Sequence, residues 1–225
     1  MKNDFDIVND FFKKTHNCMV PRPQPIDFVL HFFNNAENLF FVDVGAHNGI
    51  DWSNTFVLEK YLRWTGICIE PQEKQFEDLK KNRDCLCLNN AVYSSCGKKT
   101  FRLVSGEANM LSGFVESFTE EHTNRIDKEI SNTKSYFSDI QLDAVTLDHL
   151  FKENKINKVD YLSIDCECSE YEILRGLNLN IIKPTLISIE HNGDRISDKK
   201  CLNLLQSYGY SIGPKVCGDL FLYIN

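Results

Sequence analysis

The stretch FFVDVGAHNGID, residues 40–51, decides the fold. It begins as an apolar run typical of a buried strand, continues into a turn that contains Gly45 and Gly49, and leads into a helical pattern. Glycines at such a turn let the backbone approach a ligand closely, and the helix N-terminus that follows offers unpaired N–H groups to an anion. The spacing is G-x-x-x-G and not G-x-G-x-x-G, which weakens a dinucleotide-binding interpretation.

Short apolar runs alternate with helical patterns from Leu39 to the end of the sequence. This alternation predicts an α/β fold in which helices cover both faces of a mostly parallel sheet. The predicted strands are residues 39–45, 66–70, 85–92, 158–165, 185–190, 210–213 and 219–225. The last two strands are close enough in sequence to pair as a hairpin.

Amphipathic helices are predicted after the first two strands. In the segment 51–62, Trp52, Phe56 and Leu62 lie near one face, as expected for a helix that covers a sheet. The next segment begins with Pro71, a residue suited to the first turn of a helix.

Two more helices are predicted from their ends. Ser169 and Glu172 have the spacing of a capping box, and Gly176 is suited to end that helix. A later helix is predicted to begin at a Ser197 cap and to end at Gly209.

Two segments fall outside this alternation. Residues 1–38 contain a proline-rich spacer at 21–25 and a predicted helix over 26–35, so we expect an N-terminal helical extension packed on a domain of residues 39–225. The segment 105–138 is polar and charged, with aromatic residues spread through it. A connection of this length is typical of a lid or a substrate-binding insert.

Composition and charge limit the classes of partner. The 225 residues include 25 Lys and Arg and 32 Asp and Glu, for a formal net charge of −7, so the protein as a whole repels nucleic acid. No apolar window is long enough to span a membrane, and the first residues, MKNDFDIVND, are acidic where a signal peptide is basic. We therefore expect a cytoplasmic protein without a nucleic-acid or membrane partner.

The sequence has nine cysteines, an odd number. Without a secretory signal, free thiols in a reducing compartment are expected. Cys85 with Cys87, and Cys166 with Cys168, form C-x-C pairs inside apolar runs, whereas zinc sites usually use C-x2-4-C knuckles in turns. The cysteines are therefore interpreted as small apolar residues and not as metal ligands.

The second predicted strand ends in Glu70, which follows Asp43 by 27 residues. An acidic side chain at the carboxyl end of this strand can accept hydrogen bonds from both hydroxyls of a ribose, and a parallel sheet brings it beside the glycine turn. Asn90 and Ala91, at the end of the third strand, would then flank an adenine. An ordinary polar turn explains that pair almost as well.

Six segments together carry a family resemblance: FVDVGAHNG, GICIEP, NNAV, VTLDHL, YLSIDCECSEYEIL and ISIEHN. In order and spacing, the chain resembles the FkbM-type S-adenosylmethionine-dependent methyltransferases over about residues 38–225. The resemblance implies a class I methyltransferase (Rossmann-like) fold, with a seven-stranded sheet whose last strand is antiparallel. It also implies methyl transfer to a hydroxyl of a sugar, a glycan or another small molecule.

The same resemblance assigns a site for S-adenosyl-L-methionine. The methionine side of this cofactor would lie against the turn that contains Asp43, Gly45, Ala46, Asn48 and Gly49. Glu70 would bind the ribose, and Asn90 with Ala91 would lie near the adenine.

The sequence departs from the family pattern at two positions. The family's Asp-x-Glu-Gly-x-Glu pattern matches Asp165, Glu167 and Glu170, but Cys168 stands where Gly is expected. His47 stands where Asn is usual. Because a glycine in such a turn often has positive φ, the backbone course at Cys168 is in question.

Candidate catalytic residues follow from the chemistry. The cofactor carries an activated methyl group, so the protein has to orient an acceptor oxygen and remove its proton. His191, after the fifth strand, is the first choice for the general base because an imidazole titrates near neutrality. Asp165 would bind the substrate, hold the amino group of the cofactor, or coordinate a divalent cation together with Glu167. The cation is not favoured, because the sequence shows too few ligands for it.

Three alternatives remain open. A non-catalytic module could keep the fold and the cofactor site, as the departures at His47 and Cys168 suggest. A nucleotide-binding oxidoreductase is disfavoured by the missing G-x-G-x-x-G, and a nucleic-acid methyltransferase by the absence of a basic stripe with interleaved aromatic residues. The expected acceptor is a small molecule or a carbohydrate, and the sequence does not indicate an oligomeric state.

Overall fold

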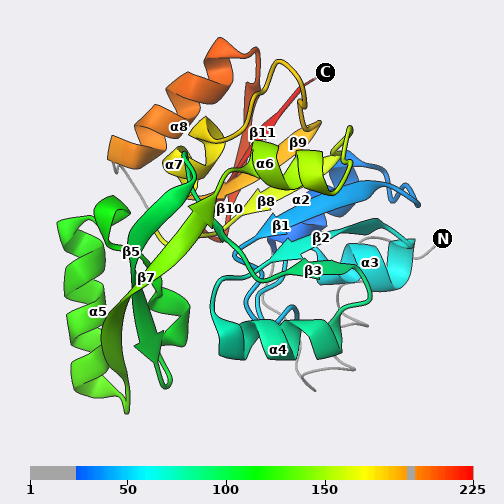
Figure 1. Ribbon diagram of the computed structural model, residues 1–225. Helices are drawn as coiled ribbons and strands as arrows, with labels where there is room; N and C mark the ends of the chain where they lie inside the picture. The colour runs from blue at the N-terminus through cyan, green and yellow to red at the C-terminus, as the bar shows by residue number, and fades with distance from the viewer. Residues whose placement is uncertain (1–23, 192–195, 225) are drawn as a thin grey trace.

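The computed structural model describes residues 24–191 and 196–224 (Figure 1). The expectations for residues 1–23, including most of the proline-rich spacer, lie outside the described residues. The first described element is helix α2 (Pro25–Phe32), which agrees in position with the helix predicted over 26–35.

The main sheet has seven strands among the described residues. In spatial order they are β10 (Ser211–Val216), β11 (Asp219–Tyr223), β9 (Leu186–Glu190), β8 (Tyr161–Ile164), β1 (Phe40–Val44), β2 (Thr65–Ile69) and β3 (Leu86–Leu88). β1 lies between β8 and β2 and is parallel to both, and β9 and β3 extend the parallel part on either side. β11 is antiparallel to β9 and to β10. The predicted seven-stranded, mostly parallel sheet with an antiparallel last strand is confirmed.

Helices cover both faces of this sheet (Figure 1). One face packs on α6 (Leu147–Glu153), α7 (Glu170–Arg175) and α8 (Ile196–Ser207), and the other packs on α2, α3 (Phe56–Leu62) and α4 (Glu73–Asn82). β1, β2, β8 and β9 are mostly apolar because both of their faces are buried, whereas the edge strand β3 is partly exposed. No helix in the described ranges is long and apolar enough to cross a bilayer.

A second, smaller sheet lies beside the main one and is visible at the left of Figure 1. Its strands, in spatial order, are β4 (Ala91–Val92), β7 (Tyr136–Val145), β5 (Gly97–Ser105) and β6 (Gly113–Phe114). The prediction of a single strand over residues 85–92 is therefore wrong. The chain leaves the main sheet after β3 and enters the second sheet at β4, with Asn89 and Asn90 between them.

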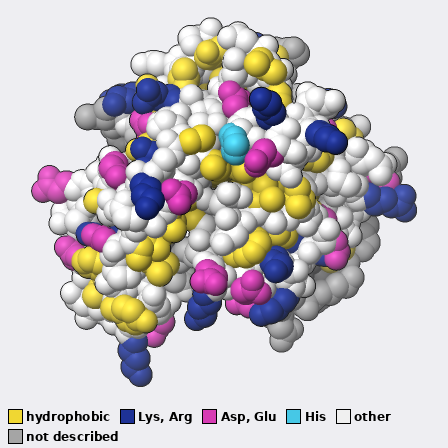
Figure 2. Space-filling model, in the orientation of Figure 1, with side chains coloured by type: hydrophobic (Ala, Val, Ile, Leu, Met, Phe, Trp, Pro, Cys, Tyr) yellow, Lys and Arg dark blue, Asp and Glu magenta, His cyan; other side chains and the backbone are white. Residues whose placement is uncertain are grey.

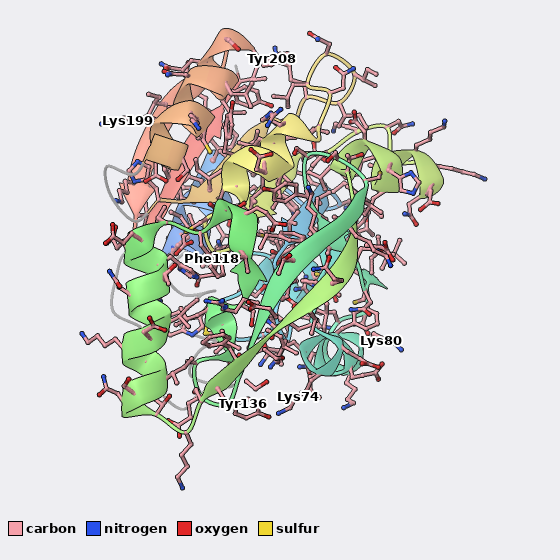
Figure 3. The ribbon with its side chains drawn as sticks, turned by 60° about the vertical axis from the view of Figure 1, so that its left-hand side comes forward. Lys74, Lys80, Phe118, Tyr136, Lys199 and Tyr208 are labelled. Carbon is pink, nitrogen blue, oxygen red and sulfur yellow. The ribbon has the colours of Figure 1, made fainter. Side chains whose placement is uncertain are left out.

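The segment 105–138 is regular structure and not a long loop. It contains the end of β5, two short 3-10 helices, η1 (Asn109–Leu111) and η2 (Val115–Ser117), strand β6, helix α5 (Glu120–Asn132) and the start of β7. Figure 3 shows α5 running alongside the second sheet, with Phe118 at the head of the helix and Tyr136 at its far end. Its function as a lid or a substrate-binding insert remains a prediction.

The helix predicted over 51–62 begins later than expected. α3 starts at Phe56, and Trp52 lies in the preceding turn with φ +59° and 77% of its surface exposed. The cause is a local turn, in which the Asn48 side chain accepts hydrogen bonds from the backbone N–H groups of Ile50 and Asp51. Placing Trp52 on the sheet-covering face was wrong.

Two other helices begin at a different place than predicted, and a third begins as predicted but without the predicted capping bonds. Pro71 precedes α4 by two residues. α7 (Glu170–Arg175) lies between Ser169 and Gly176 as predicted, but the bonds of the capping box are absent: Ser169 makes no side-chain capping bond, and Glu172 accepts a hydrogen bond from Ser94 Oγ. α8 begins at Ile196, so Ser197 lies within the helix.

Candidate active site

A cavity of about 380 Å³ opens at the carboxyl edge of the main sheet. This volume suits a small organic ligand. The ends of β1, β2, β8 and β9 and the start of β11 contribute Gly45, Glu70, Asp165, Glu190 and Asp219. The second sheet and its connections contribute Asn90, Val92, Phe101, Met110, Ser112 and Phe114, and α5 contributes Arg125. The cavity therefore lies between the two sheets.

The glycine turn forms one wall of this cavity. Gly45 has φ +86°, and a Cβ atom built there would lie 1.9 Å from the carbonyl oxygen of Asp165. The backbone N–H groups of Gly45 and Ala46 both donate to the carbonyl of Ile69, at 3.0 and 3.1 Å. Only glycine satisfies both the positive φ and the close approach of the neighbouring strand.

Glu70 faces the same turn. Its Oε2 accepts a hydrogen bond from the backbone N–H of His47 at 2.9 Å, and its Oε1 accepts one from the N–H of Gln72 at 2.8 Å. The side chain is buried, and this burial raises its pKa to about 7. The predicted convergence of the glycine turn and Glu70 on one cavity is present in the structure.

Four more carboxylates line the cavity: Asp165, Glu167, Glu190 and Asp219. The Asp165 side chain is accessible from within the cavity. Apart from this opening, Asp165 is enclosed by protein, and the resulting desolvation, followed by the charges of Glu190 and Glu167, raises its pKa well above the ordinary value. Asp219 accepts a hydrogen bond from Asn54 Nδ2 at 2.7 Å, and its burial raises its pKa to about 7. This group of carboxylates favours ligands that are cationic or that donate hydrogen bonds.

The turn after β8 positions two of these carboxylates, Asp165 and Glu167. Glu167 and Cys168 have φ values of +46° and +80°, so the position where the family has Gly is left-handed here too. The Glu170 carboxylate stabilises the turn by accepting a hydrogen bond from the N–H of Cys166 at 3.0 Å. Such backbone strain is typical of functional sites.

Helix α5 contacts this turn through Glu167. The Oε2 atom of Glu167 lies 3.3 Å from Nδ1 of the buried His122 and 3.5 Å from Nη1 of Arg125. His122 Nε2 also lies 3.2 Å from the carbonyl oxygen of Leu111, so it connects the insert to the candidate active site.

Five of the predicted site residues line the cavity: Gly45, Glu70, Asn90, Asp165 and Glu167. The other predicted cofactor-binding residues do not line the cavity but pack beneath the residues that do. Asp43 accepts a hydrogen bond from Thr55 Oγ1 at 2.6 Å, and Ala46 packs in the apolar core beneath the turn. Asn48 forms the local turn described above. A Cβ on Gly49 would lie 2.6 Å from Leu79, and Ala91 packs in the core of the second sheet.

His191 is not among the described residues that line the cavity. Its Nδ1 lies 3.2 Å from Lys215 Nζ and 3.6 Å from Asp198 Oδ2, in contact with β10 and α8. The residue before it, Glu190, occupies the cavity edge instead. Successive residues of a strand point to opposite faces, which explains why the neighbouring side chain reaches the site.

Sequence reasoning missed several cavity residues. Asp219 had a usable signal: it begins an antiparallel last strand, so its start lies at the same edge as the ends of the parallel strands. No sequence signal marked Met110, Ser112 and Arg125 as cavity residues. They belong to the insert, and no local sequence pattern encodes the position of the insert relative to the sheet. Among the described residues, no group of three His, Cys, Asp or Glu side chains is placed to hold a metal ion.

The buried carboxyls predict that stability falls as pH rises. In the unfolded chain a carboxyl ionises near pH 4, whereas Glu70 and Asp219 keep their protons in the folded chain up to about pH 7. The unfolded state therefore binds fewer protons between these values, and stability is lost through this window. We expect a loss on the order of 5 kcal/mol between about pH 5 and about pH 8, about half of it from each group, measured by urea unfolding of the ligand-free chain.

The control for this pH dependence is Asp219→Asn, which keeps the shape of the side chain without its charge. It should remove about half of the loss because Glu70 still titrates. A wild-type stability that is level or rises across the window would show that these carboxyls are ionised in the folded protein.

Comparisons with known proteins agree with this geometry. Residues 43–212 match the Methyltransferase FkbM domain. Methyltransferase 1 of Beauveria bassiana (strain ARSEF 2860) is 22% identical over 188 residues, which cover 78% of this chain and 74% of that protein. The crystal structure of methyltransferase FkbM from Methylobacillus flagellatus KT is 14% identical and superposes with a TM-score of 0.53. The alignment covers 84% of this chain and 44% of that protein, so the chain spans less than half the length of this relative.

The fold is that of a class I methyltransferase, with the cavity at the edge of the sheet where Gly45 and Glu70 meet. Because the matched region covers most of the sequence, the chain belongs to the FkbM methyltransferase domain family. The relatives in this family imply the use of S-adenosylmethionine.

Proposed function

We propose that the chain transfers a methyl group from S-adenosyl-L-methionine to a hydroxyl oxygen of a sugar, a glycan or another small molecule. One observation carries the proposal. The glycine turn at Gly45 and the carboxylate of Glu70 border the same cavity, and further carboxylates suited to a cationic group and a hydroxyl line it.

The residues present fit this cofactor. Each Glu70 oxygen accepts one backbone hydrogen bond and retains acceptor capacity, so the carboxylate would bind the ribose hydroxyls beside Asn90. The carboxylates of Asp165 and Glu190 would attract the positive charges of the amino group and the sulfonium. When bound, S-adenosylmethionine supplies an activated methyl group.

We assign the removal of the acceptor proton to Asp165. Its side chain is accessible inside the cavity, and its surroundings raise its pKa above the ordinary value, which makes the carboxylate a stronger base. The neighbouring carboxylates Glu190 and Asp219 would accept hydrogen bonds from other hydroxyls of the acceptor. His191 lies outside the cavity lining, which favours Asp165 over it for this role.

The cavity walls favour a small acceptor. Trp52 lies at the cavity and exposes 77% of its surface, so its ring is available to stack on a sugar face. On the face drawn in Figure 2, Lys and Arg side chains alternate with Asp and Glu and do not form a basic stripe. With a formal net charge of −7, this distribution supports a small-molecule or carbohydrate acceptor over nucleic acid.

The proposed function is tested by ligand-induced stabilisation and by product analysis. S-adenosylhomocysteine should raise the melting temperature, whereas NAD and ATP should not. Incubation with S-adenosylmethionine and a panel of monosaccharides and oligosaccharides should add one methyl group to a member of the panel, detected by mass spectrometry. Stabilisation without transfer to any hydroxyl compound would favour a non-catalytic cofactor-binding module, and stabilisation by NAD alone would contradict the proposal.

Removal of the Glu70 carboxylate should weaken cofactor binding. We expect Glu70→Ala to raise the Kd of S-adenosylhomocysteine by about ten- to a hundredfold, because charge-assisted hydrogen bonds to the ribose are lost. Isothermal titration calorimetry measures this Kd. Glu73→Ala removes an exposed carboxylate three residues away and is expected to leave the Kd unchanged. Equal affinities of the two variants would place the ribose elsewhere.

A further inference from the structure

Three cysteines lie together where β2 meets β3, outside the cavity. Cys68 in β2 pairs in register with Cys87 in β3, and Cys85 immediately precedes β3. The Sγ atoms of Cys68 and Cys85 lie 3.5 Å apart, and Cys87 Sγ lies 3.5 Å from the carbonyl oxygen of Cys85. All three are free thiols.

The two closest thiols differ in their surroundings. Cys68 is fully buried, whereas Cys85 is partly exposed and so within reach of a small reagent. The contact with Cys68, the contact with Cys87 and the charge of Arg83 lower the pKa of Cys85 to about 5. Burial raises the pKa of Cys68. One accessible thiolate beside one buried thiol is the arrangement that oxidises selectively, because the thiolate is the nucleophile.

Arg83 connects this cluster to the glycine turn. Its guanidinium is fully buried, donates to Glu59 Oε2 at 2.7 Å and to Thr55 Oγ1 at 3.0 Å, and reaches the carbonyl oxygen of Gly49 at 3.3 Å. Thr55 in turn donates to the Asp43 carboxylate at the end of β1. Arg83 lies two residues before Cys85, and the charges of the two side chains interact. A change in the charge of Cys85 therefore acts on a side chain that supports the cavity wall.

We propose that Cys68 and Cys85 form a reversible disulfide when the chain meets a hydroperoxide, and that this disulfide weakens ligand binding in the cavity. The second half of this inference rests on the proposed function, and the first half does not. The S–S bond length is about 2.0 Å, so the two sulfur atoms must approach each other as the bond forms.

The chemistry balances in two steps. The Cys85 thiolate attacks one peroxide oxygen, the O–O bond breaks, and Cys85 becomes a sulfenic acid while the other oxygen leaves as hydroxide or alkoxide. The sulfur of Cys68 then attacks Cys85 Sγ, the S–O bond breaks, and the departing oxygen leaves as water with the proton of the Cys68 thiol. The two thiols lose two electrons in total, and the hydroperoxide gains them.

The first test maps the bond. The reduced full-length chain is treated with hydrogen peroxide, free thiols are blocked, and peptides are analysed by mass spectrometry without reduction. The expected result is a cross-link between the Cys68 and Cys85 peptides, reversed by dithiothreitol and retained in Cys87→Ser and Cys96→Ser. A cross-link between Cys85 and Cys87, or a Cys85 that is oxidised only to sulfinic acid, would overturn the proposal.

A second variant separates failure to react from failure to fold. Cys68→Ala removes the resolving thiol but keeps a small apolar residue in the core, so a sulfenic acid should accumulate at Cys85 and react with a sulfenate-specific probe. If the variant, folded by circular dichroism, shows no sulfenate at Cys85, the proposed order of steps is wrong.

The coupling to the cavity is measured with S-adenosylhomocysteine. Oxidation should weaken its binding at least severalfold in the wild-type chain and leave Cys85→Ser unchanged. A mapped disulfide without any change in affinity overturns the coupling. If the reduced wild-type chain binds no S-adenosylhomocysteine, the proposed function fails while the disulfide site stands.

Discussion

Gly45→Ala is expected to destabilise the folded chain by about 2–5 kcal/mol. Two costs add at this position. An L-residue at φ +86° has the left-handed conformation that glycine alone tolerates well, and the new Cβ would lie 1.9 Å from the Asp165 carbonyl oxygen in the neighbouring strand. For a chain of this size, the loss corresponds to a fall in melting temperature of about 5–15 °C, measured by circular dichroism.

Gly209→Ala is the matched control. Gly209 also has φ +86°, but the nearest atom to its added Cβ would be Lys183 Nζ at 4.0 Å. It therefore carries the backbone cost without the steric one, and we expect about 1–2 kcal/mol. The difference between the two variants measures how tightly β1 and β8 approach at the cavity. Equal losses would mean that this approach is looser than the structure shows.

Asp165→Asn is expected to lower the rate of methyl transfer by about 10²–10⁴ at saturating S-adenosylmethionine. The amide preserves the size of the side chain but cannot accept a proton from a hydroxyl. The measurement is the formation of S-adenosylhomocysteine with an acceptor that the wild-type chain methylates. The affinity for S-adenosylhomocysteine is measured in parallel, because Asp165 also lies where the amino group of the cofactor would bind.

The two possible roles of Asp165 separate in these data. A general base lowers kcat and leaves the Kd of S-adenosylhomocysteine within a few fold, whereas a cofactor-binding group raises that Kd and leaves kcat at saturation nearly unchanged. His191→Gln is the companion variant, and we expect wild-type rates because His191 faces Lys215 and Asp198. A slow His191 variant beside an active Asp165 variant would restore His191 as the base.

The main sheet could be predicted because most of its strands are short, mainly apolar runs; β10, which is polar and largely exposed, is the exception. A strand buried on both faces must have this pattern, and the turns between such runs are marked by glycine and charged residues. The turn at Gly45 and the position of Glu70 follow from the same logic, since parallel strands bring their carboxyl ends together. Both residues can therefore be identified from the sequence alone.

The second sheet could not be predicted in this way. The run around residues 85–92 is continuous in hydrophobicity, and no local signal marks where the chain leaves one sheet for another. Much of β7 is exposed, so it lacks the apolar alternation that identifies a strand. The cavity residues that come from this region, among them Ser112 and Arg125, depend on long-range packing and are visible only in three dimensions.

The directions in which individual side chains point also could not be predicted from the sequence. His191 and Glu190 are adjacent, and choosing the one that reaches the cavity requires knowing the pleat of β9. Trp52 has a helical spacing with Phe56, but the side chain of Asn48 forms a turn that delays the helix and leaves Trp52 exposed at the cavity. Competing local hydrogen bonds of this kind decide helix starts without altering the hydrophobic pattern.

The most direct test of the central claim is the structure of the chain crystallised with S-adenosylhomocysteine. We predict that the ribose hydroxyls lie within hydrogen-bonding distance, about 2.5–3.0 Å, of the Glu70 carboxylate, with the chain of the ligand passing Gly45 toward Asp165. A ligand bound elsewhere on the molecule, or a cavity that stays empty at a saturating ligand concentration, would contradict the account.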